Sequence, residues 1–444
     1  MRKVLTFIII AALFLTAAGC GENQTDSTQA ALSEKSVSGI EEAVSESSAM
    51  YEAEIQSSET REVGTSDQKS NVADQIGSTT APKDEGNVTI ANSANTQLIK
   101  VELPAAEEGI KAKHQRDYWP TQEWKTTTPE EQGIDSSILK QVDSDIAAKG
   151  VNIRSLLVIK NGYIIFEKYY KDNYGINTRD EIASATKSFS SALIGIALRE
   201  GYIDNIDSSV VSILPEVLSE SSSESASKVT IRNILEMTSG FDWMDSVDEY
   251  PAMTSGDPLK YLFAKHITND PGIFWNYNTL GSHTLSALIQ KTTNLNTAVF
   301  ANAYLFQPLG IKNWDWVQVY GLPLGGHSIF LTTRDFAKFG YLYLNEGLWE
   351  NKQIIPSEWV KASLTPYNDA WGSSYQYGYQ WWIDKRVPSA YFAVGAGDQI
   401  IYMVPELDLE VVTTTDNYMG ANSFTMNNSV IYPIVDAISA AIKQ

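Results

Sequence analysis

Cysteine and histidine are scarce in this chain: its 444 residues include one cysteine, Cys20, and four histidines. A single thiol has no partner for an intramolecular disulfide, so the folded state must depend on its core. The histidines show no spacing typical of metal ligands, and we interpret all four as structural or surface residues: His114, His266, His283 and His327. We therefore expect neither a metal nor another cofactor.

Aromatic residues are nearly absent from the first quarter of the chain, and no basic cluster occurs anywhere. Tyr51 is the only aromatic residue between positions 21 and 117, and residues 21–120 hold 18 acidic against 8 basic side chains, within a net charge of −21. A segment so poor in apolar groups cannot offset the entropy of ordering itself. We expect residues 20–117 to form a disordered, acidic, Ser/Thr-rich tether, and the lack of a basic patch argues against nucleic-acid binding.

Long apolar runs are also missing, apart from one at the N-terminus. Residues 4–15 are apolar, follow Met-Arg-Lys and precede Ala-Ala-Gly-Cys at positions 17–20. This order is typical of an export signal, here residues 1–19, and the run is short for a membrane span. Its ending resembles a bacterial lipobox, which implies a lipid on Cys20 and a lipid-anchored protein on the extracytoplasmic face of the cell membrane. The alternative is an ordinary secretion signal with a chance cysteine.

The rest of the chain, residues 118–444, has the composition of a folded domain and contains all 11 tryptophans. Apolar segments at 155–170 and 399–415 are each split by turn residues, and Asn161-Gly162 is typical of a type I′ hairpin turn. Helical patterns fill most of the region between them. We predict an α/β (α+β) fold in which an antiparallel sheet, built from both ends of the domain, is flanked by helices and carries an inserted helical lobe.

A serine followed three residues later by lysine is a candidate catalytic pair. A serine hydroxyl needs a nearby base, and lysine can serve when burial lowers its pKa. Four such pairs occur, beginning at Ser66, Ser137, Ser184 and Ser225. Only Ser184 begins an amphipathic helix directly after a hairpin, where Lys187 would share its face. We predict Ser184 as the nucleophile, Lys187 as its base and the phenolate of the downstream Tyr277 as a second proton carrier.

Several motifs occur in the order seen in a known superfamily. Residues 184–187 read Ser-Ala-Thr-Lys, 237–240 read Met-Thr-Ser-Gly, and Pro-Gly at 271–272 leads to Tyr-Asn-Thr at 277–279. Further matches lie at Gly325-Gly326, at 377–382 and at 395–399. The chain resembles the serine β-lactamase and penicillin-binding-protein superfamily. The similarity is greatest to the branch with class C β-lactamases, D-stereospecific peptidases, family VIII esterases and 6-aminohexanoate-dimer hydrolases.

This resemblance implies roles for particular residues. Ser184 would be acylated, Lys187 would act as base or charge partner, and Tyr277 would shuttle the proton. The oxyanion hole would combine the Ser184 N–H with one from the strand after Gly397, contributed by Asp398 or Gln399. The resemblance thus implies that the protein hydrolyses an ester or amide bond.

Two departures from the superfamily pattern bear on the substrate. Its Lys-Thr-Gly element is replaced by glycine-rich residues from Gly395 to Gly397, and Thr279 stands where asparagine is common. Without that cation, a substrate carboxylate such as that of a β-lactam is disfavoured. Candidate substrate-binding residues are Thr279, Asp242, Trp243, Trp381 and Trp382. Asp242 and Asp245 could receive a substrate ammonium, although solvated carboxylates and core aromatics are the simpler interpretations.

The leading hypothesis is thus a serine hydrolase acting on a small-molecule or peptide-like ester or amide. Three alternatives remain at this stage. One is a conventional Ser-His-Asp hydrolase that uses His283 or His327. Another is a non-catalytic binding module of the cell envelope. The third is a D-Ala-D-Ala carboxypeptidase or β-lactamase.

Overall fold

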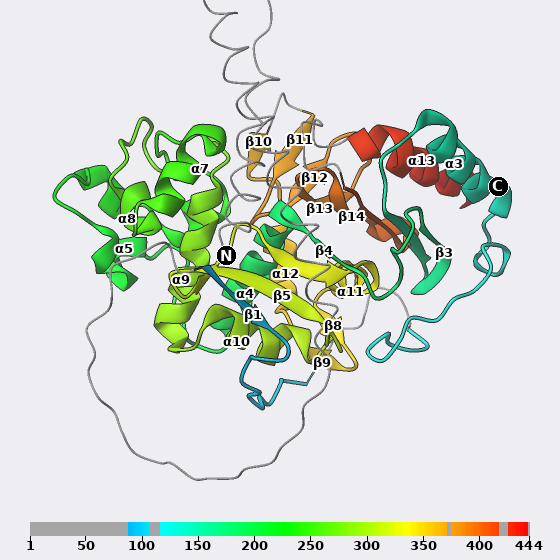
Figure 1. The fold of residues 1–444 in the computed structure, drawn as a ribbon, viewed down its shortest axis with the longest axis horizontal. Coiled ribbons are helices and arrows are strands. Elements are labelled where there is room, and N and C mark those ends of the chain that lie inside the picture. The colour runs from blue at the N-terminus through cyan, green and yellow to red at the C-terminus, as the bar shows by residue number, and fades with distance from the viewer. Residues whose placement is uncertain (1–87, 106–115, 371–373, 417–424, 443–444) are drawn as a thin grey trace, which may run out of the picture. The chain divides into compact units, whose positions relative to one another are not determined.

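The computed structural model describes residues 88–105, 116–370, 374–416 and 425–442 (Figure 1). The predicted signal peptide at 1–19, Cys20 and most of the predicted tether lie outside the described residues. Among the helices that are described, none combines the length and the apolar character needed to cross a membrane.

Within the described residues the strands form three antiparallel sheets. The strands are β1 (Val88–Asn92), β2 (Ser155–Lys160), β3 (Tyr163–Tyr169), β4 (Arg179–Glu181), β5 (Trp314–Val319), β6 (Leu322–Pro323), β7 (Ile329–Thr332), β8 (Leu348–Trp349), β9 (Lys352–Gln353), β10 (Asn368–Ala370), β11 (Tyr375–Tyr377), β12 (Trp382–Asp384), β13 (Tyr391–Gly395), β14 (Gln399–Val404) and β15 (Leu409–Thr414). The helices are α3 (Ser136–Lys149), α4 (Thr186–Arg199), α5 (Val210–Ile213), α6 (Ile231–Leu235), α7 (Asp245–Thr254), α8 (Pro258–Phe263), α9 (Thr279–Thr293), α10 (Thr297–Ala301), α11 (Thr333–Leu344), α12 (Ser357–Ser363) and α13 (Tyr432–Ile442).

The main sheet has eight strands in the order β10-β11-β12-β13-β14-β15-β2-β3. Its centre joins the two ends of the domain, because β15 pairs with β2 from Thr414 opposite Ser155 to Leu409 opposite Lys160. The turn between β2 and β3 has positive φ at both Asn161 and Gly162, 53° and 84°, as a type I′ turn requires.

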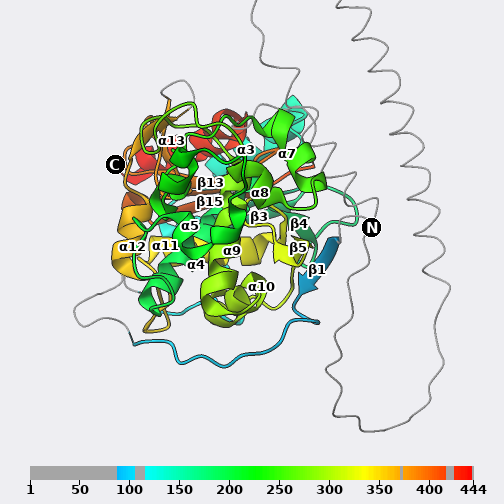
Figure 2. The ribbon, with the colours of Figure 1, turned by 90° about the vertical axis from the view of Figure 1, so that its left-hand side faces the viewer.

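Helices cover both faces of this sheet (Figures 1 and 2). On one face, α3 and α13 lie side by side, and their apolar side chains join a core cluster that includes Val158 of β2 and Tyr402 of β14. On the other face, α11 contacts β14, β15 and β2, and α4 contacts β13. Phe189 of α4 stacks on Phe339 of α11 with ring centroids 3.6 Å apart. The predicted fold class is confirmed.

The inserted lobe holds helices α5 to α10. At its centre α9 contacts α5, α6, α7, α8 and α10, and it also contacts α4. The contact between α9 and α4 is the one that matters for chemistry, because these two helices begin at Thr279 and Thr186, next to two of the predicted motifs.

A second sheet has the order β1-β5-β7-β4 and corrects the predicted extent of the tether. Strand β1 pairs with β5 from Val88 opposite Val319 to Asn92 opposite Asp315, so this part of residues 20–117 belongs to the folded body. Val88 and Ala91 are both 6% exposed. A short apolar segment that completes an open sheet edge is invisible in a composition averaged over an acidic region.

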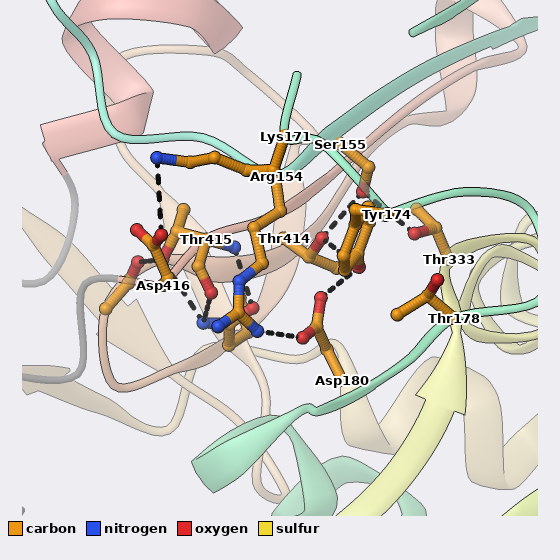
Figure 3. A network of polar contacts seen from close by, with 12 residues as sticks. Arg154, Ser155, Lys171, Tyr174, Thr178, Asp180, Thr333, Thr414, Thr415 and Asp416 are labelled. Carbon is orange, nitrogen blue, oxygen red and sulfur yellow. Dashed lines mark hydrogen bonds and ion pairs between the residues drawn. The ribbon is translucent and has the colours of Figure 1, made fainter. Parts of the chain in front are cut away.

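A polar network ties β4 to the centre of the main sheet (Figure 3). Arg154 forms an ion pair with Asp180 of β4, and the Tyr174 hydroxyl donates to the same carboxylate. Next to them, Ser155 Oγ of β2 lies 2.6 Å from Thr414 Oγ1 of β15. Because β4 leads directly into the Ser184 segment, this network fixes where that segment leaves the sheet.

Candidate active site

Ser184 lies in a single 3₁₀ turn, Ala183–Ala185, between β4 and α4. The expected helix from residue 184 therefore begins two residues later, at Thr186. Ala183 adopts a positive φ of 44°, which is unusual for a residue with a side chain and is often found at functional turns. Gly395 of β13 packs directly on this turn, since a Cβ there would lie 2.2 Å from the Ile182 carbonyl oxygen.

Lys187 reaches back to Ser184 from the first turn of α4. The side chain is 2% exposed, and its Nζ lies 3.0 Å from Ser184 Oγ, 3.0 Å from Thr279 Oγ1 and 2.8 Å from the Gly326 carbonyl oxygen. Burial lowers the pKa of Lys187 to about 8, against the opposing effects of Asp245 and Glu249. Near neutral pH both the ammonium and the free amine are therefore accessible, which a proton acceptor requires.

Tyr277 completes the group around the Ser184 hydroxyl. Its phenol hydrogen-bonds with Ser184, and Lys187 Nζ lies 4.8 Å from the centroid of its ring. On its other side the ring stacks on Trp382, with centroids 6.1 Å apart. Burial raises the pKa of Tyr277 far above its ordinary value, and Asp245 adds to the rise. The predicted phenolate is therefore not the resting form, and Tyr277 is a neutral donor.

Behind Lys187 the structure reveals a carboxylate that the sequence patterns did not connect to the base. Asp245 Oδ2 accepts from Thr279 Oγ1 at 2.5 Å, and Oδ1 accepts from the Thr279 N–H at 2.9 Å. Trp243 Nε1 donates to the same carboxylate. Burial raises the pKa of Asp245, as does the neighbouring Glu249. Asp245, considered earlier for a substrate ammonium, is instead directed at Thr279.

Two other predicted motifs bring these parts together. Gly326 lies so close to α9 that a Cβ would sit 2.7 Å from the Thr279 carbonyl oxygen, and this approach brings its own carbonyl to Lys187. Gln380, which lies in the match at 377–382 but was given no role, is buried and links three helices. It accepts from Ser282 Oγ of α9 at 2.7 Å and from Ser188 Oγ of α4 at 2.7 Å, and it donates to the Leu235 carbonyl of α6 at 2.9 Å.

Two histidines with no apparent ligand spacing meet beside Lys187. The His283 and His327 rings are 5.1 Å apart, and their nitrogens and a Glu249 oxygen lie within 4.8 Å of one another, so the three could hold a metal ion. However, His283 Nδ1 accepts the Gly326 N–H at 2.8 Å, so the neutral ring carries its proton on Nε2. A metal-bound histidine has the reverse arrangement, in which the other nitrogen donates. These residues therefore fit a metal poorly.

The histidine chemistry also bears on the Ser-His-Asp alternative. His327 Nε2 lies 2.8 Å from Glu249 Oε1, and its Nδ1 lies 2.5 Å from Ser328 Oγ. Burial lowers the pKa of His283 well below its ordinary value, assisted by His327 and Lys187. The hydrogen bonds of both rings are thus directed elsewhere, whereas Ser184 faces Lys187.

The predicted substrate-binding residues fall into two groups. The two polar residues differ from each other, because Asp242 is exposed and Thr279 contacts Lys187. The three tryptophans are buried, with exposed fractions of 4% for Trp243, 0% for Trp381 and 3% for Trp382. Trp381 packs between Phe339 and Tyr343, away from Ser184, so its prediction as a pocket residue is wrong. In the adjacent pair Trp381-Trp382 the side chains point to opposite faces of the main sheet, and only Trp382 reaches Tyr277.

The predicted oxyanion strand also needs a correction. The Asp398 N–H donates to the Gly395 carbonyl at 3.0 Å, closing a tight turn in which Gly397 and Asp398 have φ of 77° and 70°. Its carboxylate accepts from the Met426 N–H. The Asp398 N–H is therefore used to close this turn rather than to bind an oxyanion. Gln399 is opposite Gly395 in the sheet, and its side chain amide donates to the Thr415 carbonyl at 3.1 Å.

The fold and the Ser184, Lys187 and Tyr277 geometry define a class, the serine hydrolases that use lysine in place of histidine. Comparison with known proteins agrees: the family model named Beta-lactamase matches residues 142–428, and the chain belongs to this family. The predicted superfamily is thereby confirmed.

Individual relatives are distant. The chain is 22% identical over 283 residues to a 6-aminohexanoate-dimer hydrolase of Paenarthrobacter ureafaciens, covering 58% of this chain and 71% of that protein. It is 25% identical over 237 residues to an uncharacterized protein of Alkalihalophilus pseudofirmus, covering 47% of this chain and 63% of that protein. Among solved structures, a Bacillus anthracis protein provisionally described as a 6-aminohexanoate-dimer hydrolase gives a TM-score of 0.59 at 20% identity, covering 80% and 92% of the two chains.

Proposed function

We propose that the protein hydrolyses an ester or amide bond through an acyl-Ser184 intermediate. The observation that carries this proposal is the position of Lys187 Nζ, 3.0 Å from Ser184 Oγ, together with a pKa lowered to about 8 by burial. The named hydrolases among the relatives support the class of reaction, since they include a 6-aminohexanoate-dimer hydrolase by sequence and a family VIII carboxylesterase by fold.

In the acylation step the free amine of Lys187 takes the Ser184 hydroxyl proton as Oγ bonds to the substrate carbonyl carbon. The tetrahedral intermediate then expels the leaving group, which receives a proton from the neutral Tyr277 phenol. The Lys187 ammonium returns a proton to Tyr277, which restores both groups. Water repeats the sequence on the acyl-enzyme, and the carboxylic acid product leaves with Ser184 regenerated.

The developing oxyanion requires backbone donors close to Ser184. We assign one to the Ser184 N–H. Because the Asp398 N–H is used within its own turn, the second is to be sought in the segment around Gly395 and Ala396, which packs on the Ser184 turn.

The site favours a substrate without a carboxylate. A side chain at Gly395 would collide with the Ile182 carbonyl, so this position cannot carry the lysine of a Lys-Thr-Gly element. The nearest charged groups to Lys187 include Asp245 and Glu249, which would repel an anion. A neutral or cationic, small-molecule or peptide-like ester or amide fits this environment better than a β-lactam or a D-Ala-D-Ala peptide.

Intact-protein mass spectrometry tests the proposal. We expect a fluorophosphonate and p-nitrophenyl butyrate to add one phosphonyl or acyl group to the wild-type protein, and we expect Ser184→Ala to prevent both. Ser137→Ala is the matched control, because Ser137 also precedes a lysine by three residues but is exposed on α3. An unlabelled wild-type protein would favour the non-catalytic binding module, and a stable penicillin adduct on Ser184 would favour the β-lactam alternative.

We further propose that Cys20 carries the lipid that anchors the protein to the extracytoplasmic face of the cell membrane. The support is the order of basic, apolar and small residues before Cys20, followed by an acidic segment before the body. In this organisation residues 1–19 are removed, and the body comprises residues 118–444 together with β1. Cys20→Ser should move the protein from the membrane fraction to the soluble fraction, and retention of the variant in membranes would refute the anchor.

A further inference from the structure

We propose that Asp245 is a positioning residue that directs the lone pair of Lys187 at Ser184 by fixing the Thr279 hydroxyl as an acceptor. This inference rests on the proposed function, because it concerns how the base of that reaction is aimed. It depends on a count of the hydrogens shared by Lys187, Thr279 and Asp245.

The first count is at Lys187 Nζ, which has three polar neighbours: Ser184 Oγ, Thr279 Oγ1 and the Gly326 carbonyl oxygen. An ammonium donates to all three. The free amine has two hydrogens and one lone pair, so one neighbour must face the lone pair. The Gly326 carbonyl can only accept, and therefore always takes a hydrogen. The lone pair then faces either Ser184, as a base must, or Thr279, where it does no chemistry.

The Thr279 hydroxyl decides between these two arrangements. It has a single hydrogen, which it can donate either to the lone pair of Lys187 or to Asp245 Oδ2, 2.5 Å away. An ionised carboxylate has no hydrogen of its own and is the stronger acceptor. Asp245 therefore takes the Thr279 hydrogen, the Thr279 oxygen accepts from Lys187, and the lone pair is left for Ser184.

Asp245 is held for this task by groups that all donate to it. Its Oδ1 accepts from the Thr279 N–H at 2.9 Å, at the first residue of α9, where the helix dipole also favours a negative charge. Trp243 Nε1 donates to the same oxygen. Three donors on one carboxylate, together with the neighbouring Lys187, favour its ionised form against the burial and the Glu249 charge that raise its pKa.

The charge of Asp245 has a second effect on Lys187. The titratable groups around the amine are Asp245 and Glu249 from α7, Tyr277 and His283 from the α9 segment, and His327 beyond Gly326, paired with Glu249. Of these, the two carboxylates favour the ammonium. Removing Asp245 therefore lowers the pH at which Lys187 loses its proton, as well as misdirecting its lone pair.

The test measures the rate of fluorophosphonate labelling of Ser184 against pH in the full chain and in Asp245→Asn. The asparagine keeps the shape but presents donor hydrogens to Thr279. We expect Asp245→Asn to be labelled about 100-fold more slowly at its pH optimum. We also expect the acidic limb of the pH profile, where the labelling rate rises as Lys187 loses its proton, to move to lower pH. A loss of packing alone would slow labelling without moving that limb. Asp270→Asn, which removes an exposed carboxylate from the same lobe, should label as the wild type does.

A double-mutant cycle with Thr279→Val provides the decisive comparison. Without a hydroxyl at 279, Asp245→Asn should cost almost nothing further in the rate at the pH optimum, although the acidic limb still moves, whereas Thr279→Ser should keep most of the wild-type rate. If Asp245→Asn does not fold, the test is the comparison of the labelling rates of Thr279→Val and Thr279→Ser. If Asp245→Asn is labelled at the wild-type rate with its acidic limb unmoved, or if the losses in the cycle are additive, this inference is overturned while the proposed function stands. An unlabelled wild-type protein would overturn the proposed function itself.

Discussion

Lys187 and Glu410 are two ionisable side chains buried in the same body, and they differ in what surrounds them. Lys187 is 2% exposed and has three hydrogen-bonding neighbours around its amine. Glu410 of β15 is 0% exposed, and neither of its carboxyl oxygens has a hydrogen-bond partner in the described parts of the chain. Burial favours the neutral form of both, lowering the pKa of Lys187 to about 8 and raising that of Glu410 well above its ordinary value.

The different surroundings of Lys187 and Glu410 show which neighbours keep both protonation states of a buried side chain accessible. Around Lys187, the Asp245 and Glu249 carboxylates oppose the effect of burial on its pKa, so both protonation states are accessible near neutral pH. Around Glu410, the nearby Asp408 reinforces burial, while Arg116 is engaged by Asp408 in an ion pair. Glu410 is therefore a neutral acid of the core, whereas Lys187 has the protonation behaviour that the proposed base requires.

The largest expected effect follows from fixing the charge of Lys187. Lys187→Arg keeps a cation but cannot release its proton, because the pKa of arginine stays above about 12. We expect kcat/KM for p-nitrophenyl butyrate to fall by about 1000-fold or more, as it should in Lys187→Ala. Steady-state kinetics with thermal unfolding as the folding control measures this. Substantial activity in folded Lys187→Arg would contradict the assignment of Lys187 as base.

The sequence predicted those parts of the fold and the site that depend on short-range patterns. The Ser-x-x-Lys spacing, the Asn-Gly hairpin turn and the strands at both ends of the domain are short-range patterns, and each pointed to the right element. Asp245 was not linked to Lys187, because the connection passes through Thr279 of a different helix. The β1 strand was hidden by the acidic composition around it, and Trp381 was misjudged because neighbouring residues can face opposite sides of a sheet.

Glu410 was missed for a related reason: within the apolar strand from Leu409 to Thr414, one glutamate is no sign of where its side chain goes. The structure also separated residues that the sequence treated alike. Asp242 is exposed, whereas Asp245 lies behind the base, although only three positions separate them. Long-range packing decides such cases, and a single sequence does not contain it.

Glu410→Gln should remove a pH dependence of stability. Because the pKa of Glu410 is raised in the folded state, the folded protein holds this proton after the unfolded chain has lost it. The contribution is fully present below the unfolded pKa and is lost as pH rises toward the folded pKa, at about 1.4 kcal/mol per pH unit. We expect urea unfolding to show that the stability of the glutamine variant rises relative to that of the wild type as the pH rises above about 5.

Glu406→Gln is the matched control for that measurement, since Glu406 is exposed four residues earlier and undergoes the same chemical replacement. We expect this control to run parallel to the wild type across the same pH range. If Glu410→Gln and wild type also run parallel, Glu410 is ionised in the folded state. The contrast with Lys187 would then fail.

The smallest expected effect concerns the packing that keeps Glu410 without a partner. Gly340 of α11 lies against it: a Cβ at this position would meet Glu410 Oε1 at 2.1 Å and Ile401 Cγ2 at 2.4 Å. Alanine is the better helix former by about 1 kcal/mol, but overpacking costs about 1–3 kcal/mol. We therefore expect Gly340→Ala to be destabilising by about 1 kcal/mol in urea unfolding near pH 5. Because the glutamate supplies the nearest contact, Glu410→Ala should relieve part of this cost in the double variant. Strictly additive free energies of unfolding would show that α11 and Glu410 are not in the close contact that excludes water and partners from the carboxyl group.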